Sequence, residues 1–172
     1  MQHQTAIPFI GAIIERISEG GDLEILIQTR WKPERDPKYS GTFEFVAGVL
    51  DKQYENVYET LRREVLEETG LQLDKVINDS QTKVFSPQKD DGAFGFRPFC
   101  CTQQLKDGKP WVGFIFRCRV KDGEPKDQEA ETRGVHWMKA TELRDIFNNN
   151  PEKLFTLEIP AWDYYFNEVE IG

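Results

Sequence analysis

Runs of apolar residues in the first fifty positions predict the start of a β-sheet. Residues 7–17 are mostly apolar, which is the pattern of a strand buried on both faces. The Gly20–Gly21 pair predicts a turn, and residues 23–28 alternate between polar and apolar, so we expect an antiparallel hairpin. A third short strand is predicted at residues 43–47, directly before Gly48.

The second half of the chain predicts further strands and a helix. Residues 111–120 are β-rich and long enough for a central strand, and residues 100–105 precede them across a turn, so the two should pair. Residues 135–138 predict another strand, and Thr141 suits the N-cap of a helix that continues to Asn148. Two shorter strands are also expected, at residues 84–86 and 94–96.

The segment from Pro151 onward has no regular period. It is rich in aromatic residues that we expect to pack against the body of the protein or another subunit: Trp162, Tyr164, Tyr165 and Phe166. No internal repeat, low-complexity tract or linker interrupts the chain. Strands mixed with two helices over residues 1–172 therefore predict a single α/β domain, large enough to bury about 70% of its unfolded surface.

The best-defined helix is predicted between Asn56 and Leu71. Asn56 is a favourable N-cap, and Gly70 suits the left-handed residue just past a helix end. No Pro or Gly lies between these two caps, so one helix of about three turns is expected. The apolar face of this helix, which should be buried, consists of Val57, Leu61 and Val65.

Acidic residues interrupt that apolar face. Glu64 and Glu68 fall on it, and Glu67 lies just off its edge. Burying an unpaired carboxylate is costly, and two neighbouring carboxylates also repel each other. A divalent cation between them would explain the arrangement, because carboxylate oxygens suit Mg²⁺ or Mn²⁺. The alternative is ordinary surface charge, as the spacing of Glu59, Arg63 and Glu67 would allow.

Composition narrows the range of partners. The net charge of −8 argues against a nucleic-acid polymer or an anionic membrane, and a polyanionic small substrate would need a metal or a basic patch. Three cysteines, two of them adjacent at Cys100–Cys101, favour free thiols in a reducing cytoplasm. The apolar run at residues 7–14 is too short for a membrane span and lacks preceding basic residues, so we expect a soluble cytoplasmic protein.

The segment from residue 48 to residue 71 resembles the Nudix box, a family signature written G-x5-E-x7-R-E-U-x-E-E-x-G-U, in which U is a bulky aliphatic residue. The second half of the signature matches without a gap, at Arg63, Glu64, Val65, Glu67, Glu68, Gly70 and Leu71. Glu55 stands at the family's distance before Arg63, but six residues instead of five separate it from Gly48. The loop into the helix therefore carries one extra residue.

The resemblance implies a fold and a reaction. The fold is the Nudix-type α-β-α sandwich around a mixed β-sheet. The reaction is the hydrolysis of the pyrophosphate linkage in a nucleoside diphosphate joined to another group, with Mg²⁺ or Mn²⁺ as cofactor. The implied metal ligands are Glu64, Glu67, Glu68 and the backbone carbonyl of Ala47. The residues implied to keep the box in shape are Gly48, Glu55, Arg63 and Gly70.

The general base stays open between two catalytic candidates, Glu64 and Glu131. Glu131 stands six residues before Trp137, where some Nudix enzymes carry an additional acidic residue that binds metal or acts as the base. The alternative for Glu131 is a loop acid that only faces water.

Substrate residues are expected after the second strand. Arg30 lies where Nudix enzymes often place a phosphate-contacting arginine, and Trp31 beside it could stack a base, although an exposed loop of mixed charge is the alternative. Pro87 stands sixteen residues past Leu71, as in families that cleave ADP-ribose, but a turn proline would look the same. The expected partner is a small nucleotide, either a nucleoside triphosphate or an ADP-ribose-like compound.

A catalytically silent Nudix domain that senses a nucleotide is the alternative function. Such domains usually lose a glutamate of the box, and all of the box glutamates are present in this chain. Homodimers are common in the family, so a homodimer is compatible with the resemblance, although the sequence identifies no interface.

Overall fold

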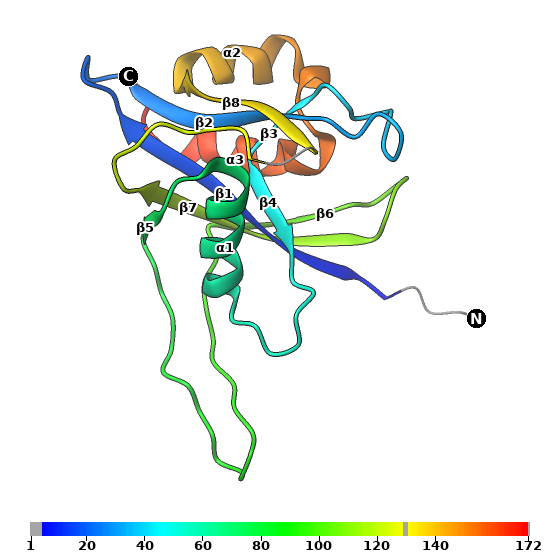
Figure 1. The fold of residues 1–172 in the computed structure, drawn as a ribbon, viewed down its shortest axis with the longest axis vertical. Helices are drawn as coiled ribbons and strands as arrows, with labels where there is room; N and C mark the ends of the chain where they lie inside the picture. The colour runs from blue at the N-terminus through cyan, green and yellow to red at the C-terminus, as the bar shows by residue number, and fades with distance from the viewer. Residues whose placement is uncertain (1–4, 129–130, 172) are drawn as a thin grey trace.

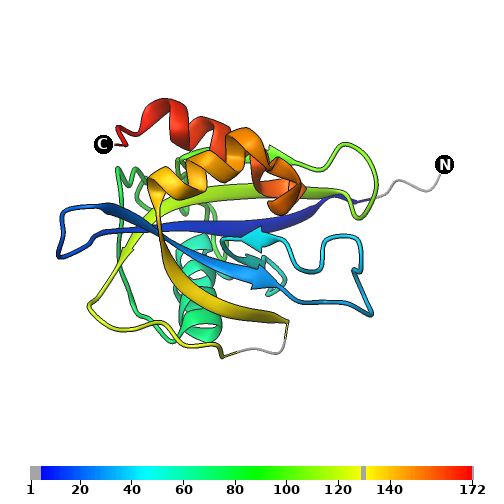
Figure 2. The ribbon, with the colours of Figure 1, turned by 90° about the horizontal axis from the view of Figure 1, so that it is seen from above.

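The computed structural model describes residues 5–128 and 131–171, and its elements are labelled in Figure 1. A mixed β-sheet separates two layers of helix. In Figure 2, α1 (Val57–Thr69) lies below the sheet, whereas α2 (Ala140–Asn149) and α3 (Ile159–Glu168) lie above it. Two separate hydrophobic clusters complete the core. The expected α-β-α sandwich is confirmed.

The strand β1 (Ile7–Ile17) is the axis of the sheet. It pairs in parallel with β7 (Trp111–Val120) over most of its length. Its first half also pairs antiparallel with β4 (Val46–Val49), and its last residues pair with β2 (Leu23–Arg30). Its side chains alternate between the two hydrophobic clusters, which explains why seven successive residues of β1, from Phe9 to Glu15, are buried. The predicted bounds of this strand are confirmed.

Four shorter strands complete the sheet: β3 (Phe43–Glu44) and β8 (Thr132–Lys139) beside β2, and β5 (Leu73–Val76) and β6 (Cys100–Gln103) beside β7. The prediction of one strand at residues 43–47 is wrong. The Phe45 N–H donates to the Glu158 carboxylate at 2.8 Å instead of to a neighbouring strand. The chain therefore leaves β2 after β3 and joins β1 as β4.

The predicted caps of α1 are confirmed. The Asn56 side chain accepts a hydrogen bond from the Tyr58 N–H at 2.8 Å, which satisfies a free donor at the start of the helix. Gly70 has a φ of 71°, a left-handed conformation that glycine adopts without steric strain. Both ends of the helix that carries the box are thus fixed by local contacts.

The C-terminal third of the chain is more helical than the sequence predicts. The helix α2 begins at Ala140, directly after β8, so the prediction of Thr141 as its N-cap is wrong. The pattern does not predict α3, although Pro160 suits its first turn. Trp162 and Tyr165 of α3 are fully buried. No helix in the described ranges is long and apolar enough to cross a membrane.

Residues 77–99, which we call the arm, leave the body between β5 and β6 as a long hairpin at the bottom of Figure 1. The strands predicted at residues 84–86 and 94–96 do not form, and isolated bridges join the two sides of the arm instead. Phe96 packs on the core beside α1, whereas Phe85 is exposed. Only the base of the arm is therefore anchored by apolar contacts.

Candidate metal and substrate site

The helix α1 carries three of the predicted site residues. Glu64 and Glu68 are on its buried side, with 12% of the Glu64 side chain and 7% of Glu68 exposed to solvent. Glu67 lies at the edge, with 47% of its side chain exposed. The predicted placement of the three glutamates on the helix agrees with the structure, whereas their roles as metal ligands stay predictions.

The glycine of the box lets β4 and α1 approach closely. A Cβ atom at Gly48 would lie 2.0 Å from Cδ of Glu64 and 2.4 Å from its Oε1, far inside van der Waals contact. Gly48 is fixed in turn by its pairing with Ile10 of β1. Glycine therefore makes room for the Glu64 carboxylate. Ala47 stands one residue before this contact, and its carbonyl stays a predicted metal ligand.

Arg63 binds three carboxylates of the box, those of Glu55, Glu64 and Glu67, through one guanidinium group. Its Nη1 donates to Glu64 and, at 3.2 Å, to Glu67. Its Nη2 and Nε donate to Glu55 at 3.2 Å and 3.4 Å. The hydrogen bond from Arg63 lowers the pKa of Glu55 below its usual value. The geometry of Arg63 and Glu55 suits the orienting role that the resemblance implies.

The extra residue before Glu55 does not disturb this pair. Tyr54 has a φ of 63° and is 95% exposed, so the loop bulges into solvent immediately before Glu55. Glu55 still contacts Arg63 and also accepts a hydrogen bond from Thr60 Oγ1 at 2.9 Å. The insertion is therefore absorbed outside the site.

Gln28 on β2 is a site residue that sequence reasoning missed. Its Nε2 donates to Oε2 of Glu68 at 2.7 Å, and Gln28 itself is 1% exposed. The three residues before it, 25–27, are buried and apolar. A polar residue that continues a buried apolar run was the available signal.

Arg30, the predicted phosphate ligand, is paired inside the protein. Its Nη2 and Nε donate to Asp36 at 2.7 Å and 3.0 Å, and its Nη1 donates to Glu44 at 3.0 Å. The guanidinium carbon also lies 4.4 Å from the centre of the Phe155 ring. Burial raises the pKa of Glu44, although Arg30 opposes this shift. A phosphate bound to Arg30 would compete with two carboxylates, so that role stays a prediction.

Trp31 and Glu131 lie together beyond the end of β2. The backbone N–H of Trp31 donates to the backbone carbonyl of Glu131 at 2.7 Å. The Arg133 guanidinium lies 3.3 Å from the centre of the Trp31 ring. The Glu131 carboxylate pairs with Lys32 at 2.6 Å and with Arg35 at 2.8 Å. The hydrogen bond from Lys32 lowers the pKa of Glu131. An acid of low pKa is a weak base, and the catalytic role of Glu131 stays a prediction.

The donor set on α1 fits a hard divalent cation. Mg²⁺ typically takes one or two protein carboxylates and completes its shell with water and substrate phosphate. Glu64 and Glu68, one helical turn apart, supply such a pair of carboxylates. Within residues 5–128 and 131–171, no three His, Cys, Asp or Glu side chains converge closely enough to hold a metal ion. The arrangement suits a cation whose shell is completed by its substrate.

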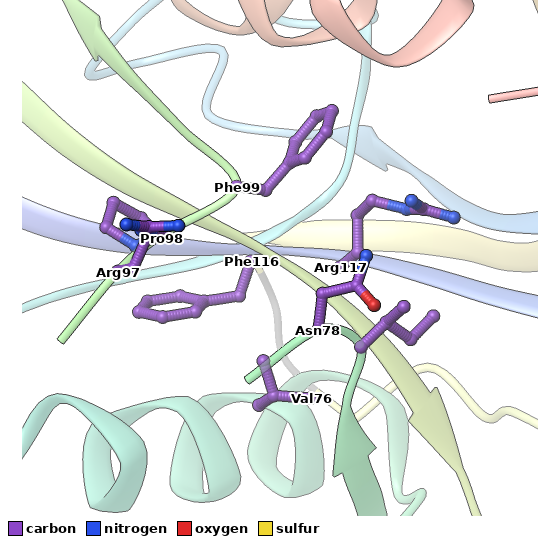
Figure 3. Close-up of a pocket in the computed structure, with 8 residues that line it drawn as sticks. Val76, Asn78, Arg97, Pro98, Phe99, Phe116 and Arg117 are labelled. Atoms are coloured by element: carbon purple, nitrogen blue, oxygen red, sulfur yellow. The ribbon is translucent and has the colours of Figure 1, made fainter. Parts of the chain in front are cut away.

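Two hollows lie elsewhere on the molecule. A cavity of about 150 Å³ lies at the base of the arm. Figure 3 shows Arg97, Phe116 and Arg117 around it. A wider cleft of about 680 Å³ borders the C-terminal end of α1 at Gly70 and extends to Lys126. Among the described residues that line these hollows, none is a glutamate of the box.

Comparison with known proteins places this geometry in a family. A family model described as the NUDIX domain matches residues 10–157. No curated protein matches the chain.

Several solved structures share the fold. The NUDIX domain of Shewanella oneidensis NrtR, complexed with ADP ribose, is 9% identical with a TM-score of 0.66, and the match covers 98% of this chain and 91% of that one. A MutT protein from Methanosarcina mazei Go1 is 17% identical with a TM-score of 0.64, over 98% of both chains. A NUDIX hydrolase from Nitrosomonas europaea is 17% identical with a TM-score of 0.61, over 95% of this chain and 90% of that one.

Proposed function

The chain belongs to the Nudix family of pyrophosphohydrolases, and on this premise we propose that it cleaves the pyrophosphate linkage of a nucleoside diphosphate joined to another group, with Mg²⁺ or Mn²⁺ as cofactor. The observation that carries the proposal is the contact of the Glu64 carboxylate with Gly48, with Glu68 one turn further on the same buried side. Two neighbouring carboxylates on one helix face repel each other, and a divalent cation bound between them would offset that repulsion.

Each residue of the box has a distinct part in this reaction. A bound divalent cation would neutralise negative charge on the pyrophosphate oxygens and lower the pKa of a water bound to it. Glu64 and Glu68 would hold the cation, and Glu67 would approach from the exposed edge of the helix. Arg63 keeps Glu64 and Glu67 together through its Nη1, and Glu55 fixes Arg63 from the other side.

Glu64 is our proposed general base. It is also ion-paired, with Arg63, but it lies on the same side of α1 as Glu68, so it could take a proton from a water bound to the proposed cation. Glu131, the other candidate, is ion-paired with Lys32 and Arg35, and the hydrogen bond from Lys32 lowers its pKa. It would have to exchange these partners before it could act on the substrate.

We propose an ADP-ribose-like compound or a nucleoside triphosphate as the substrate. In support, the Nudix domain of NrtR, which has the same fold, is complexed with ADP ribose. Trp31 follows the end of β2, and we propose that it stacks the base on the ring face that Arg133 leaves open.

The remaining parts of the proposal concern domain organisation, location, oligomeric state and partners. We propose that residues 1–172 act as a single domain in the cytoplasm, as a monomer or a homodimer. The net charge of −8 disfavours nucleic-acid polymers and anionic membranes as partners.

The test is product release from nucleoside triphosphates, ADP-ribose, dinucleotides and nucleotide sugars, each with Mg²⁺, with Mn²⁺ and with EDTA. We expect metal-dependent turnover of one substrate class and none with EDTA. Nucleotide binding without turnover of any compound would instead favour a sensor. Turnover that persists in EDTA would overturn the role assigned to Glu64 and Glu68.

A further inference from the structure

Gln28 occupies a position that a stable core would fill with an apolar side chain. Leu26, two residues earlier on β2, belongs to the hydrophobic cluster beside α1. Gln28 is almost completely buried, and its Nε2 donates to Glu68, a residue 40 positions away in sequence. Burial of an amide destabilises a fold unless its groups are hydrogen-bonded. The placement of this amide therefore needs an explanation.

Only one end of the Gln28 amide is bonded by the protein. Its Oε1 is buried and has no hydrogen-bond partner among the residues that the structure describes. An unpaired buried acceptor destabilises the folded state, so it needs an explanation, and a bound water or ion is one such explanation. This acceptor belongs to the same amide that holds the Glu68 carboxylate.

A second buried acid lies beside Gln28. Glu44 stands directly opposite it in the ladder between β2 and β3. Opposed residues have Cβ atoms about 4.5–5.5 Å apart, so the two side chains are neighbours. Arg30 donates to Glu44 at 3.0 Å and balances its charge. The neutral amide of Gln28 therefore separates Glu68 from a carboxylate that already has its own cation.

We propose that Gln28 is a positioning residue of the metal site: its N–H fixes the orientation in which Glu68 binds the cation, and its Oε1 accepts a hydrogen bond from a water or hydroxyl group at that site. The inference rests on the proposed function. A neutral donor suits this task, because Arg or Lys would add a positive charge that repels the cation. Hydrogen bonds to metal-binding side chains typically change metal affinity or activity 10- to 100-fold.

The test replaces Gln28 with methionine, which keeps the length of the side chain and removes both polar groups. We expect the dissociation constant for Mn²⁺, measured without substrate by electron paramagnetic resonance, to rise about 10- to 100-fold in Gln28→Met. The Mn²⁺ concentration for half-maximal turnover should rise by the same factor. The KM for substrate at saturating Mn²⁺ should stay within about twofold of wild type, a separation that a merely structural role would not produce.

A matched control is Thr102→Val on β6. Thr102 is also buried, and its Oγ1 also has no hydrogen-bond partner in the described part of the chain. We expect Mn²⁺ affinity and turnover of this variant to equal those of wild type. Thermal unfolding of both variants checks that they are folded.

The outcomes separate the two proposals. If wild type binds Mn²⁺ and hydrolyses substrate but Gln28→Met does so equally well, the role of Gln28 is wrong and the proposed function stands. If wild type neither binds Mn²⁺ nor shows metal-dependent turnover, both are wrong. A lower unfolding temperature with unchanged Mn²⁺ affinity would make Gln28 a structural residue only.

Discussion

Two buried carboxylates on opposite faces of the sheet are held in different ways. Glu15 of β1 accepts hydrogen bonds from Arg117 at 3.0 Å and 3.2 Å and from the Tyr165 hydroxyl at 2.8 Å, on the side of α3. Glu68, on the side of α1, accepts one at 2.7 Å from the neutral amide of Gln28. Glu15 forms an ion pair within the fold, whereas Gln28 orients Glu68 without adding charge. The contrast separates a carboxylate that stabilises the protein from one that we propose binds a cation.

The largest expected effect is the loss of hydrolysis in Glu68→Gln. This change keeps the size of the side chain and removes the charge, so turnover should fall about 1000-fold, or about 4 kcal/mol in activation free energy. The free energy of unfolding should stay constant or rise, because one negative charge fewer relieves repulsion on α1. Product release and urea unfolding measure the two quantities. Wild-type turnover in this variant would contradict the metal assignment.

The matching change, Glu15→Gln, should lower stability and leave activity nearly unchanged. Breaking a buried ion pair typically lowers the free energy of unfolding by about 3–5 kcal/mol. Because Arg117 is partly exposed, we expect Glu15→Gln to lose about 3 kcal/mol. The folded variant should keep kcat/KM within about twofold. Urea unfolding and steady-state kinetics below the unfolding transition test this. A stable but inactive Glu15→Gln protein would remove the distinction between the two carboxylates.

A smaller effect is expected at Gly48. The Cβ of Gly48→Ala would lie 2.0 Å from Cδ of Glu64, so the carboxylate must move. We expect a 10- to 100-fold loss of kcat/KM, or about 1.4–2.7 kcal/mol. Gly92→Ala in the arm is the control, because its Cβ would find its nearest neighbour at 3.7 Å, an ordinary contact. Equal activity of the two variants would mean that the Glu64 position is not critical.

The smallest effect concerns Glu158, a third buried carboxylate, whose Oε2 accepts a hydrogen bond from the Phe45 N–H. Burial raises its pKa well above the usual 4.5. A carboxylate with a raised pKa stabilises the fold below its unfolded-state pKa, and this contribution is lost as the pH rises through its folded-state pKa. We therefore expect Glu158→Gln to match the stability of wild type near pH 4 and to be more stable than wild type near pH 8, as urea unfolding at the two pH values would measure. A stability difference that is constant from pH 4 to pH 8 would show that Glu158 keeps its usual pKa.

Local patterns predicted the parts of the fold that depend on neighbours in sequence. The apolar run of β1 and the two caps of α1, Asn56 and Gly70, act within a few residues of themselves. The helix α3 could not be predicted in this way, because Trp162 and Tyr165 have no strong helix preference of their own. Their burial against the sheet stabilises that helix instead.

In the candidate site, too, features set by nearby residues could be predicted from sequence, and contacts between distant residues could not. The spacing of Glu64, Glu67 and Glu68 on one helix was readable from sequence, because helical geometry fixes which of them share a face. The bond from Gln28 to Glu68 joins residues 40 positions apart, and no local signal specifies it. The partners of Arg30 were also hidden, because its contact with Glu44 depends on how β2 and β3 pair.

The parallel pairing of β1 with β7 sets the order in which the protein can assemble during its synthesis. It joins Ile7 to Trp111, so the closing segment is about 100 residues long, and such distant pairing slows folding. Ribosomes add about 5–20 residues per second, so β1 leaves the ribosome several seconds before its partner exists. Although β2 and β4 follow soon after it, β1 therefore waits for its long parallel partner. A nascent chain that stalls before Val120 would expose an apolar strand edge, the kind of surface on which chains aggregate and chaperones act.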